Sequence, residues 1–410
     1  MRGAEERDRR QAAIEAMNAP IPLPADGRGH QADADDGGWL MFHSVGKYAG
    51  QKEAIKAALA TFADQWCATD DSRWAELDQG RQEMLDRWSD LIGAPHGSVM
   101  AAENVTACYD AFFEALPRPT LAGRRVLIAE DCFPSLHFLL AGLAPRLGFE
   151  LVTVGLRKGA VSVEDEDFIA AWDERVAVAV ITWVTSTASR RCDLDALVAH
   201  GRSVGSIVTV DITQAVGCLP FDVNAPAIDF AASTSLKWMC GVPGAGMAYV
   251  SPALLPSLEP RRRGWFSQPD PFNWQLDRFA LAADARRFDN GTPSYLPYIA
   301  SLPGLRWLVE TGIEPIRTRN LALSTRLMEI ADNHRLRIVS PRDAAKRGGT
   351  VVVEIPADHS PDDIQRGLMA AGIVCDTRSE RMRWSPGLIT DMASLDVLDR
   401  ELAGLLRGRG

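Results

Sequence analysis

The chain lacks a long apolar run, an excess of positive charge and closely spaced pairs of cysteines. No apolar stretch approaches the roughly 20 residues that a membrane-spanning helix needs. The formal net charge is −10, which argues against nucleic acid or an anionic membrane as a main partner. Seven cysteines form an odd set without close pairing, so we expect reduced, mostly structural thiols and no metal site.

Two further signals are missing. No Gly-x-Gly-x-x-Gly sequence follows a predicted strand, which disfavours a nucleotide-binding dehydrogenase. The N-terminal residues are charged and contain no apolar core, so a secretory signal is not expected and a cytoplasmic location is predicted. The composition is otherwise that of an ordinary globular protein, and 410 residues are enough for two domains.

Three segments of the chain differ in pattern. Residues 1–40 are predicted to form an N-terminal arm, because their second half is rich in Pro, Gly and Asp and has no periodicity. In residues 41–290, the predicted large domain, short apolar strands alternate with helical patterns. Residues 291–410 are predicted to form a smaller α+β domain, in which longer helical patterns accompany a few strands.

The alternation in the large domain predicts an α/β fold. Apolar strands separated by helices indicate a buried, mostly parallel sheet with helices on both faces. Ligands of such sheets bind beyond the carboxyl ends of the strands. The strands are predicted at 126–128, 151–154, 176–184, 207–211, 230–232 and 246–250, and those of the small domain at 337–339, 350–354 and 373–375.

Lys237 is the residue that indicates the chemistry most directly. It follows the hydroxyl-rich segment 233–235 and precedes the glycine-rich segment 241–246, while Asp211 ends a predicted strand and Gln214 comes three residues later. Pyridoxal phosphate requires an amine for a Schiff base, an acid at a strand end and nearby hydroxyls. A single lysine is usually a surface charge, but this order and spacing favour a pyridoxal-phosphate site.

The other needs of this cofactor assign further residues. A carboxylate beside the pyridine nitrogen keeps it protonated, and Asp211 is the candidate, with a turn or helix-cap aspartate as the alternative. An aromatic face holds the ring flat, and Phe133 is placed for this after a strand, unless it is a core residue. Helix N-terminal amides and hydroxyls suit the phosphate. The candidates for that role are Val105, Thr106, Thr234 and Ser235.

These residues resemble the aminotransferase class V group of fold-type I pyridoxal-phosphate enzymes, which includes kynureninase, cysteine desulfurases and isopenicillin N epimerase. The resemblance runs from about His43 to Trp384 and is most specific between Asp211 and the glycines that follow Lys237. It implies that Asp211 pairs with the pyridine nitrogen, that Gln214 contacts the ring hydroxyl and that Lys237 carries the Schiff base. Phe133 lies in a segment similar to the stacking segment of kynureninases.

The resemblance also implies a substrate site and a second subunit. The segment 287–293 is similar to one that reaches the phosphate of the partner subunit, which implies a homodimer with shared sites and a role for Thr292, with a helix cap as the alternative. Arg383 resembles the arginine that binds the α-carboxylate of an amino-acid substrate, and Arg378 is its nearest competitor. Trp265 resembles a substrate-pocket tryptophan, unless it is ordinary packing. His43 is hypothesised to face the substrate, with a structural role equally open.

Departures from the family narrow the reaction. The only late cysteine, Cys375, lies in an apolar segment, which disfavours persulfide chemistry. Kynureninases usually have histidine and tyrosine where this chain has Gln214 and Leu236, which disfavours kynurenine itself as the substrate. We therefore expect an enzyme that acts on another α-amino acid. A Cβ-lyase is favoured, an aminotransferase or a racemase or epimerase remains the alternative, and a degenerate binding module is the non-enzyme alternative.

Overall fold

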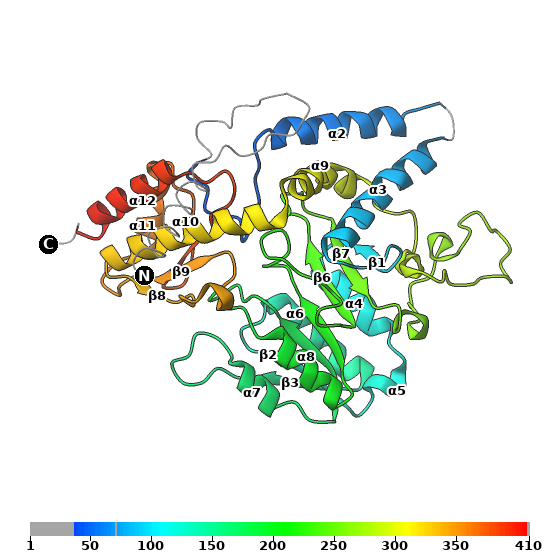
Figure 1. Ribbon diagram of the computed structural model, residues 1–410. Coiled ribbons are helices and arrows are strands. Elements are labelled where there is room, and N and C mark those ends of the chain that lie inside the picture. The colour runs from blue at the N-terminus through cyan, green and yellow to red at the C-terminus, as the bar shows by residue number, and fades with distance from the viewer. Residues whose placement is uncertain (1–36, 70–71, 408–410) are drawn as a thin grey trace, which may run out of the picture.

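The computed structural model describes residues 37–69 and 72–407, and the structural statements below refer to these ranges (Figure 1). The predicted N-terminal arm, residues 1–40, lies almost wholly outside the described residues. Within them, a seven-stranded sheet with flanking helices forms the larger part of the molecule, and a four-stranded sheet with its own helices forms the smaller part.

The large sheet is mostly parallel, as predicted. Its strands follow the order β1-β7-β6-β5-β4-β2-β3, and only β7 runs antiparallel to its neighbours. The sequence pattern did not reveal β1, a short strand at the edge. The strands are β1 (Val99–Ala102), β2 (Arg125–Ala129), β3 (Glu150–Val154), β4 (Val176–Thr182), β5 (Ile207–Asp211), β6 (Phe230–Thr234) and β7 (Gly246–Val250).

Both faces of this sheet are covered, which explains its continuous apolar strands. In β2, Leu127 packs into one core, whereas Val126 and Ile128 pack into the core on the opposite face. The core of Val126 and Ile128 includes side chains of α4 (Val105–Ala115) and α6 (Pro134–Leu147). The core of Leu127 includes side chains of α3 (Ser72–Leu91), α8 (Leu194–Ser203) and α9 (Leu296–Thr311). The short helices α5 (Arg118–Leu121) and α7 (Asp165–Ala170) lie in connections.

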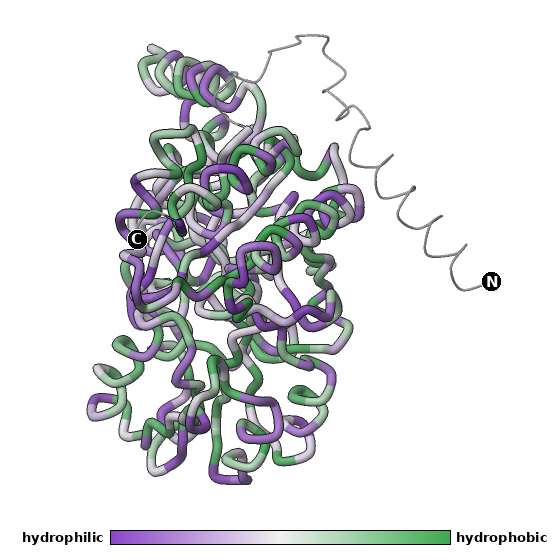
Figure 2. Tube along the Cα trace, turned by 90° about the vertical axis from the view of Figure 1, so that its left-hand side faces the viewer, coloured by the Kyte–Doolittle hydropathy of each residue, from purple (hydrophilic) through white to green (hydrophobic). Residues whose placement is uncertain are grey.

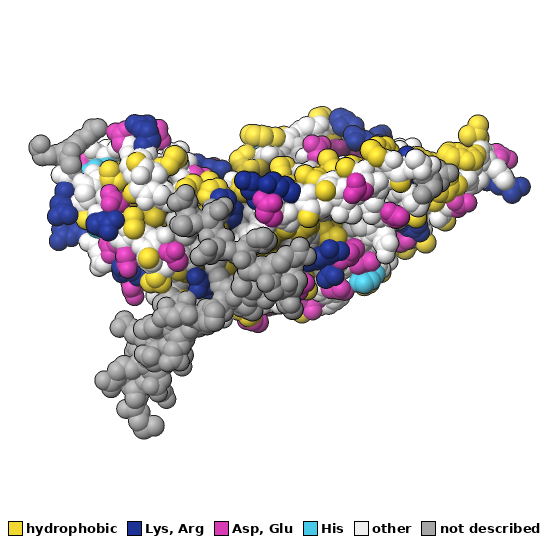
Figure 3. Space-filling model, turned by 90° about the horizontal axis from the view of Figure 1, so that it is seen from above, with side chains coloured by type: hydrophobic (Ala, Val, Ile, Leu, Met, Phe, Trp, Pro, Cys, Tyr) yellow, Lys and Arg dark blue, Asp and Glu magenta, His cyan; other side chains and the backbone are white. Residues whose placement is uncertain are grey.

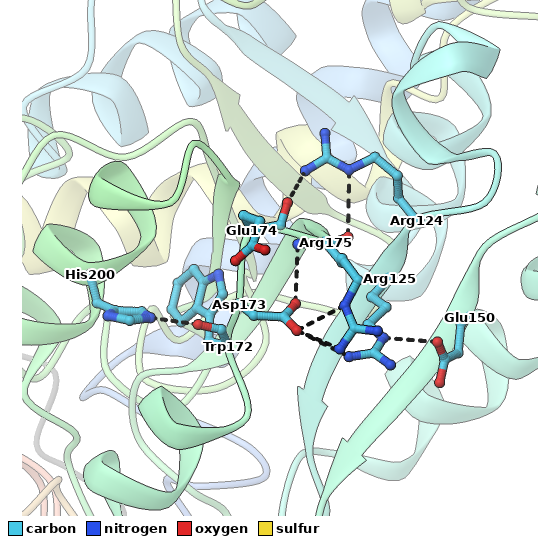
Figure 4. Close-up of polar contacts among 8 residues, drawn as sticks. All are labelled: Arg124, Arg125, Glu150, Trp172, Asp173, Glu174, Arg175 and His200. Carbon is cyan, nitrogen blue, oxygen red and sulfur yellow. Dashed lines mark hydrogen bonds and ion pairs between the residues drawn. The ribbon is translucent and has the colours of Figure 1, made fainter.

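Charged side chains gather where the parallel strands begin. Arg125, the first residue of β2, lies 2.8 Å from a carboxylate oxygen of Glu150 and 3.3 Å from one of Asp173 (Figure 4). His200 contacts the carbonyl of Trp172 at 2.7 Å in the same region (Figure 4). These contacts lie at the amino ends of the strands, so the opposite edge of the sheet is the one available for a ligand.

The smaller part of the molecule has an antiparallel sheet with strand order β10-β11-β9-β8. The strand predicted at 373–375 is wrong: only Val374 makes an isolated bridge there, with Trp39, and the strand begins at the next polar residues. A short apolar run was mistaken for a strand because buried connections are apolar too. The elements are β8 (Arg337–Ile338), β9 (Val351–Glu354), β10 (Asp376–Arg378), β11 (Arg381–Trp384), α11 (Pro361–Ala370) and α12 (Met392–Leu405).

One long helix, α10 (Ile313–Asn333), joins the two parts (Figure 1). Near its start, Ile316 packs into a core of the large sheet, and further along Leu323 and Leu327 pack into the core of the small sheet. Leu40, which precedes the first described helix, also packs into that smaller core. The boundary predicted between residues 290 and 291 stays a prediction.

Helix α2 (Gln51–Trp66) has no buried residue. The exposed fraction is 37% for Leu59 and 43% for Trp66, and hydrophobic side chains are visible over this face of the molecule (Figure 3). Hydrophilic and hydrophobic segments alternate along the surface helices (Figure 2). Among the described residues, no helix combines the length and apolar character required to cross a membrane.

Candidate active site

A cavity of about 640 Å³ lies at the carboxyl edge of the large sheet. The ends of β4, β5 and β6 meet the start of α4 and of α6 there, which is the position expected for a ligand of such a sheet. The cavity brings together most of the residues that the sequence singled out. Those that line it are Val105, Thr106, Phe133, Asp211, Gln214, Thr234 and Lys237.

Lys237 follows β6 and projects into this cavity. Its Nζ lies 5.3 Å from the centroid of the Phe133 ring, on the face of the ring. Burial lowers the pKa of Lys237 to about 8, although the Asp211 carboxylate opposes this shift. A larger fraction of the Lys237 amine is therefore uncharged near neutral pH than in an exposed lysine, and the uncharged form is the one that acts as a nucleophile or a base.

Asp211 is the last residue of β5 and is 6% exposed. Its Oδ1 accepts a hydrogen bond from the backbone N–H of Thr213 at 2.9 Å, which fixes the carboxyl group at the cavity wall. Burial raises the pKa of Asp211, while Thr213 and the Lys237 ammonium act in the opposite direction. A cation placed at this wall would be held by the buried carboxylate of Asp211.

Gln214 connects the cavity to the chain segment before α2. Its side-chain amide donates to the backbone carbonyl of His43 at 3.0 Å, and the carbonyl end of the side chain remains for a ligand. Gly46 in the same segment donates its N–H to the carbonyl of Leu236 at 2.9 Å. A Cβ atom at Gly46 would lie 1.8 Å from the carbonyl oxygen of Lys237, so only glycine permits this approach.

The start of α4 provides amides for an anionic group. Asn104 caps the helix by accepting a hydrogen bond from the Ala107 N–H at 2.9 Å, whereas the amides of Val105 and Thr106 have no carbonyl partner within the helix. Gly246 of β7 lies directly behind this turn, because a Cβ atom there would lie 2.7 Å from Cα of Asn104. The glycine that ends the predicted motif thus sets the position of the helix N-terminus.

Several buried hydroxyl groups at the cavity have no hydrogen-bond partner among the described residues. Buried hydroxyl groups are normally paired, so unpaired ones at a cavity indicate the position of a ligand. Of these hydroxyl groups, only that of Thr234 in β6 was predicted from the sequence. The ends of β4 and β5 lie at the same carboxyl edge of the sheet, so hydroxyl groups there could have been predicted in the same way. The hydroxyl groups belong to Thr182, Ser186, Thr213 and Thr234.

The structure does not bring Ser235 to the cavity. Its hydroxyl donates to the carbonyl of Val242 at 2.9 Å and lies 3.1 Å from the hydroxyl of Ser301. The side chain is fully buried and supports the turn that carries Lys237. The predicted role of Ser235 in holding a phosphate is therefore corrected: successive residues of a strand point to opposite sides, and Thr234 takes the side of the cavity.

Arg383 of β11 lies beside the cavity and contacts one of the residues that line it. It forms a two-pronged contact with Asp376, and its Nη1 donates to the carbonyl of Ser186 at 3.3 Å. Since Ser186 lines the cavity, the Nη1 end of the guanidinium is the end nearest to a bound ligand. Arg378 is exposed overall. The partial burial of its side chain and the charge of Arg383 nevertheless lower its pKa. No role in the site was predicted for Asp376, although the pattern Asp376-x-Arg378 was one of the kynureninase-like features that favoured a Cβ-lyase.

His43 does not line the cavity. It is 3% exposed, with Nδ1 2.6 Å from the Ser385 hydroxyl and Nε2 3.1 Å from a carboxylate oxygen of Asp376. Burial lowers the pKa of His43, and Asp376 only partly offsets this effect. The hypothesis that His43 faces the substrate is therefore corrected, because both ring nitrogens face protein groups.

Two predicted residues lie away from this cavity. Trp265 packs edge-on against Trp74 and stacks on Trp274, with ring centroids 5.9 and 5.8 Å apart, so it belongs to a group of aromatic side chains. Thr292 is exposed in the segment before α9. Within a single chain neither residue reaches the cavity, so their predicted roles stay predictions.

The cysteines and metal ligands add little chemistry. Cys375 is 2% exposed, and burial raises its pKa to about 12, so the thiolate form is strongly disfavoured. Across residues 37–69 and 72–407, no group of three or more His, Cys, Asp or Glu side chains is arranged to hold a metal ion.

The chain is similar over most of its length to known proteins. The family model described as Aminotransferase class-V matches residues 69–379. A kynureninase from Pseudomonas fluorescens is 26% identical over 345 residues, which cover 80% of this chain and 79% of that protein. A kynureninase from Koribacter versatilis is 25% identical over 390 residues, covering 89% and 90% respectively.

Solved structures show the same fold. The apo structure of a cysteine desulfurase from Thermococcus onnurineus aligns with a TM-score of 0.82 at 18% identity, covering 95% of this chain and all of that one. A cystine C–S lyase in complex with its product cysteine persulfide aligns with a TM-score of 0.80, also at 18% identity, covering 90% and 98%. At these identities the likeness concerns the fold alone.

Proposed function

Because the chain belongs to the aminotransferase class V family, we propose that it is a pyridoxal-phosphate enzyme that acts on an α-amino acid as a Cβ-lyase. The observation that carries this proposal is the position of Lys237. Its amine is buried, its pKa is lowered to about 8, and it lies over the ring of Phe133 in the same cavity as Asp211. A surface lysine would have none of these properties.

The residues of the cavity fit pyridoxal phosphate. The unpaired hydroxyl of Thr234 and the amides at the start of α4 are donors for a phosphate. The buried carboxyl group of Asp211 suits a protonated pyridine nitrogen, and the face of Phe133 suits the ring. Lys237 supplies the amine that binds the aldehyde. Each part of the cofactor therefore has a partner of matching chemistry.

When bound, this cofactor withdraws electrons from the α-carbon of an attached amino acid. The chain contributes the proton transfers and the orientation. Nζ of Lys237 takes the α-proton, because burial lowers its pKa to about 8 and so brings it closer to neutral pH. Asp211 holds a proton at the pyridine nitrogen, and Arg383 binds the substrate carboxylate through the Nη1 end of its guanidinium.

Two observations favour cleavage at Cβ over the alternatives: the relatives of the chain and the apolar wall of the cavity. The relatives described above are kynureninases, and one of them matches nine tenths of this chain. Leu136, Leu139 and Val184 give the cavity a largely apolar wall, which accommodates a substrate side chain and excludes water. Transamination or epimerisation by the same residues is the alternative that product analysis separates.

The first experiment records the visible absorption spectrum of the purified protein before and after borohydride. We expect a band that borohydride removes, a covalent label on Lys237, and neither in Lys237→Ala. Lys158→Ala, a change at an exposed lysine, is the control and keeps both. A protein that pyridoxal phosphate cannot colour would overturn the proposal. Product analysis and α-deuterium exchange across amino acids then distinguish lyase, aminotransferase and racemase.

We further propose that the active unit is a homodimer. The apolar residues Leu59 and Trp66 of α2 are 37% and 43% exposed in the single chain, and a second copy is the partner that would cover them. Thr292, exposed before α9, is then free to reach the cofactor phosphate of the partner. Sedimentation should give a dimer, and Leu59→Glu with Trp66→Glu should give a folded monomer. Met369→Glu, a change at an exposed residue of the small domain, should remain dimeric.

A cytoplasmic location stays a prediction.

A further inference from the structure

Three charged or titratable side chains form a closed group beside the cavity. Asp376 accepts from Nε and Nη2 of Arg383, and its Oδ1 also lies 3.1 Å from Nε2 of His43. The exposed fractions of His43 and Arg383 are 3% and 7%, so water screens little of their charge. Nε2 of His43 makes no hydrogen bond besides this contact with Asp376.

The charges of this group balance in the ligand-free protein. The Arg383 guanidinium is positive. The contacts of Asp376 with His43 and with Arg383 together outweigh burial and lower the pKa of that carboxyl group to about 2. Burial keeps His43 neutral near neutral pH, because its pKa lies below the ordinary value. The sum of the three charges is therefore zero.

A substrate carboxylate changes this balance. It approaches the Nη1 end of Arg383, next to Ser186 at the cavity wall, while Asp376 already occupies the other edge of the guanidinium. One cation then faces two carboxylates in a buried place. A buried charge is strongly unfavourable there unless another charge compensates it.

We propose that a carboxylate ligand binds to Arg383 together with one proton, which His43 takes up while Asp376 links the two sites. The proton comes from solvent, an N–H bond forms at Nδ1 of His43, and the four charges again sum to zero. The inference rests on the proposed function, since it requires that Arg383 receive the substrate carboxylate. It gives His43 and Asp376 a positioning and charge-balancing role that does not require contact with the substrate.

The hydroxyl groups beside His43 can serve both of its charge states. Nδ1 lies 2.6 Å from the Ser385 hydroxyl, which lies 2.7 Å from that of Thr350. With neutral His43, Ser385 donates its proton to Nδ1 and accepts one from Thr350. With protonated His43, Nδ1–H donates to Ser385, whose hydroxyl rotates to donate to Thr350. No buried donor is left without an acceptor at Nδ1 in either state.

The other charges near His43 work against its protonation in the ligand-free protein. Arg383 and Lys237 are both positive and both lower the pKa of His43, while Asp376 raises it. Arg378 adds a further positive charge next to Arg383. A bound carboxylate is the component that reverses this balance, so proton uptake should accompany ligand binding and not precede it.

The test measures the binding of amine-free carboxylates, from acetate to 3-phenylpropanoate, to the cofactor-loaded protein by calorimetry. Titrations in buffers with different ionisation enthalpies count the protons taken up. At pH 7 to 8 we expect uptake approaching one proton, and affinity should fall by up to about tenfold per pH unit as pH rises. In His43→Gln the uptake and this pH dependence should both disappear. His96→Gln, a change at an exposed histidine that contacts Asp90, is the matched control and should keep them.

Asp376→Asn provides an independent variant if His43→Gln does not fold. Without the Asp376 charge, a carboxylate ligand alone neutralises Arg383, so binding should become tighter and independent of proton uptake. A purely structural role for Asp376 would weaken binding instead. Circular dichroism tests whether each variant is folded.

The outcomes separate this inference from the function on which it rests. Binding that Arg383→Lys weakens, but that takes up no proton, would overturn the inference and leave the carboxylate site intact. Carboxylate binding that does not depend on Arg383 would overturn both. Uptake that persists in His43→Gln would place the proton on another group and reject the role of His43.

Discussion

The Nζ atom of Lys237 lies 5.3 Å from the centroid of the Phe133 ring, although the two residues are far apart in the sequence. Lys237 follows β6 and Phe133 precedes α6, so the sheet order brings together residues about a hundred positions apart. The ring covers the amine without offering it a hydrogen bond. The same face is therefore available to a flat cofactor ring once the amine has formed its covalent bond.

Replacing Phe133 by Leu should weaken cofactor binding about two- to tenfold, because stacking contributes about 0.5–1.5 kcal/mol beyond burial. Titration of the cofactor-free protein with pyridoxal phosphate, followed by absorption, measures this. Phe138→Leu is the control, since Phe138 lies in α6, the helix that Phe133 directly precedes, and is 71% exposed. Equal effects of the two changes would show that Phe133 does not stack on the ring.

The amine of Lys237 should titrate near pH 8 in the cofactor-free protein. Below that pH the amine is protonated and unreactive, so acylation of Lys237, measured by peptide mass spectrometry, should rise through a midpoint of about 8. Asp211→Asn should move this midpoint to lower pH, because the Asp211 carboxylate stabilises the ammonium form. A midpoint unchanged by Asp211→Asn would mean that the two groups do not interact.

Much of the fold and the cofactor-facing part of the site could be predicted from the sequence. Lys237, Asp211 and Gln214 lie at strand ends or just beyond, and parallel strands bring their carboxyl ends to one edge whatever the details of packing. The apolar runs of β2 to β7 are long enough to be recognised. The edge strand β1 was missed because it is short and its last two residues are only half-buried.

The small-domain part of the site could not be predicted in the same way. Asp376 and Arg383 face each other across the hairpin of β10 and β11. His43 joins them only because the chain before α2 pairs with the small sheet, through bridges such as Met41 with Ser385. Such long-range pairings leave no periodicity in the sequence. Ser235 was misassigned for a local reason, since composition does not show which of two adjacent hydroxyls faces the cavity.

Thr234 and Ser235 should respond differently to loss of their hydroxyls. Thr234→Val should weaken pyridoxal phosphate about tenfold or more, because a hydrogen bond to a charged group contributes about 1.5–3 kcal/mol. Pyridoxal without phosphate should bind the variant and the parent equally. Ser235→Ala should leave cofactor affinity nearly unchanged but lower the unfolding free energy, since its hydroxyl bonds Val242. A phosphate-specific effect at Ser235 would contradict the orientation of these side chains.

The buried ion pair between Arg81 and Asp289 should matter for stability. Nη1 and Nη2 of Arg81 donate to the two carboxylate oxygens of Asp289 at 3.1 and 2.6 Å, and the side chains are 6% and 9% exposed. Arg81→Ala leaves Asp289 without its cation in a buried position, which should lower the free energy of unfolding by about 3–5 kcal/mol. Urea denaturation followed by circular dichroism measures this difference.

The exposed pair of Lys56 and Glu53 is the matched control for Arg81. Their nitrogen and oxygen lie 2.8 Å apart, as close as in the buried pair, but their side chains are 59% and 54% exposed. Lys56→Ala should therefore change the unfolding free energy by less than about 1 kcal/mol, because water already solvates both charges. Since Asp289 lies in the same segment as Thr292, residues 287–293, Arg81→Ala should also weaken cofactor binding if that segment holds a phosphate. Equal destabilisation by the two changes would show that burial does not set the cost of breaking the Arg81 pair.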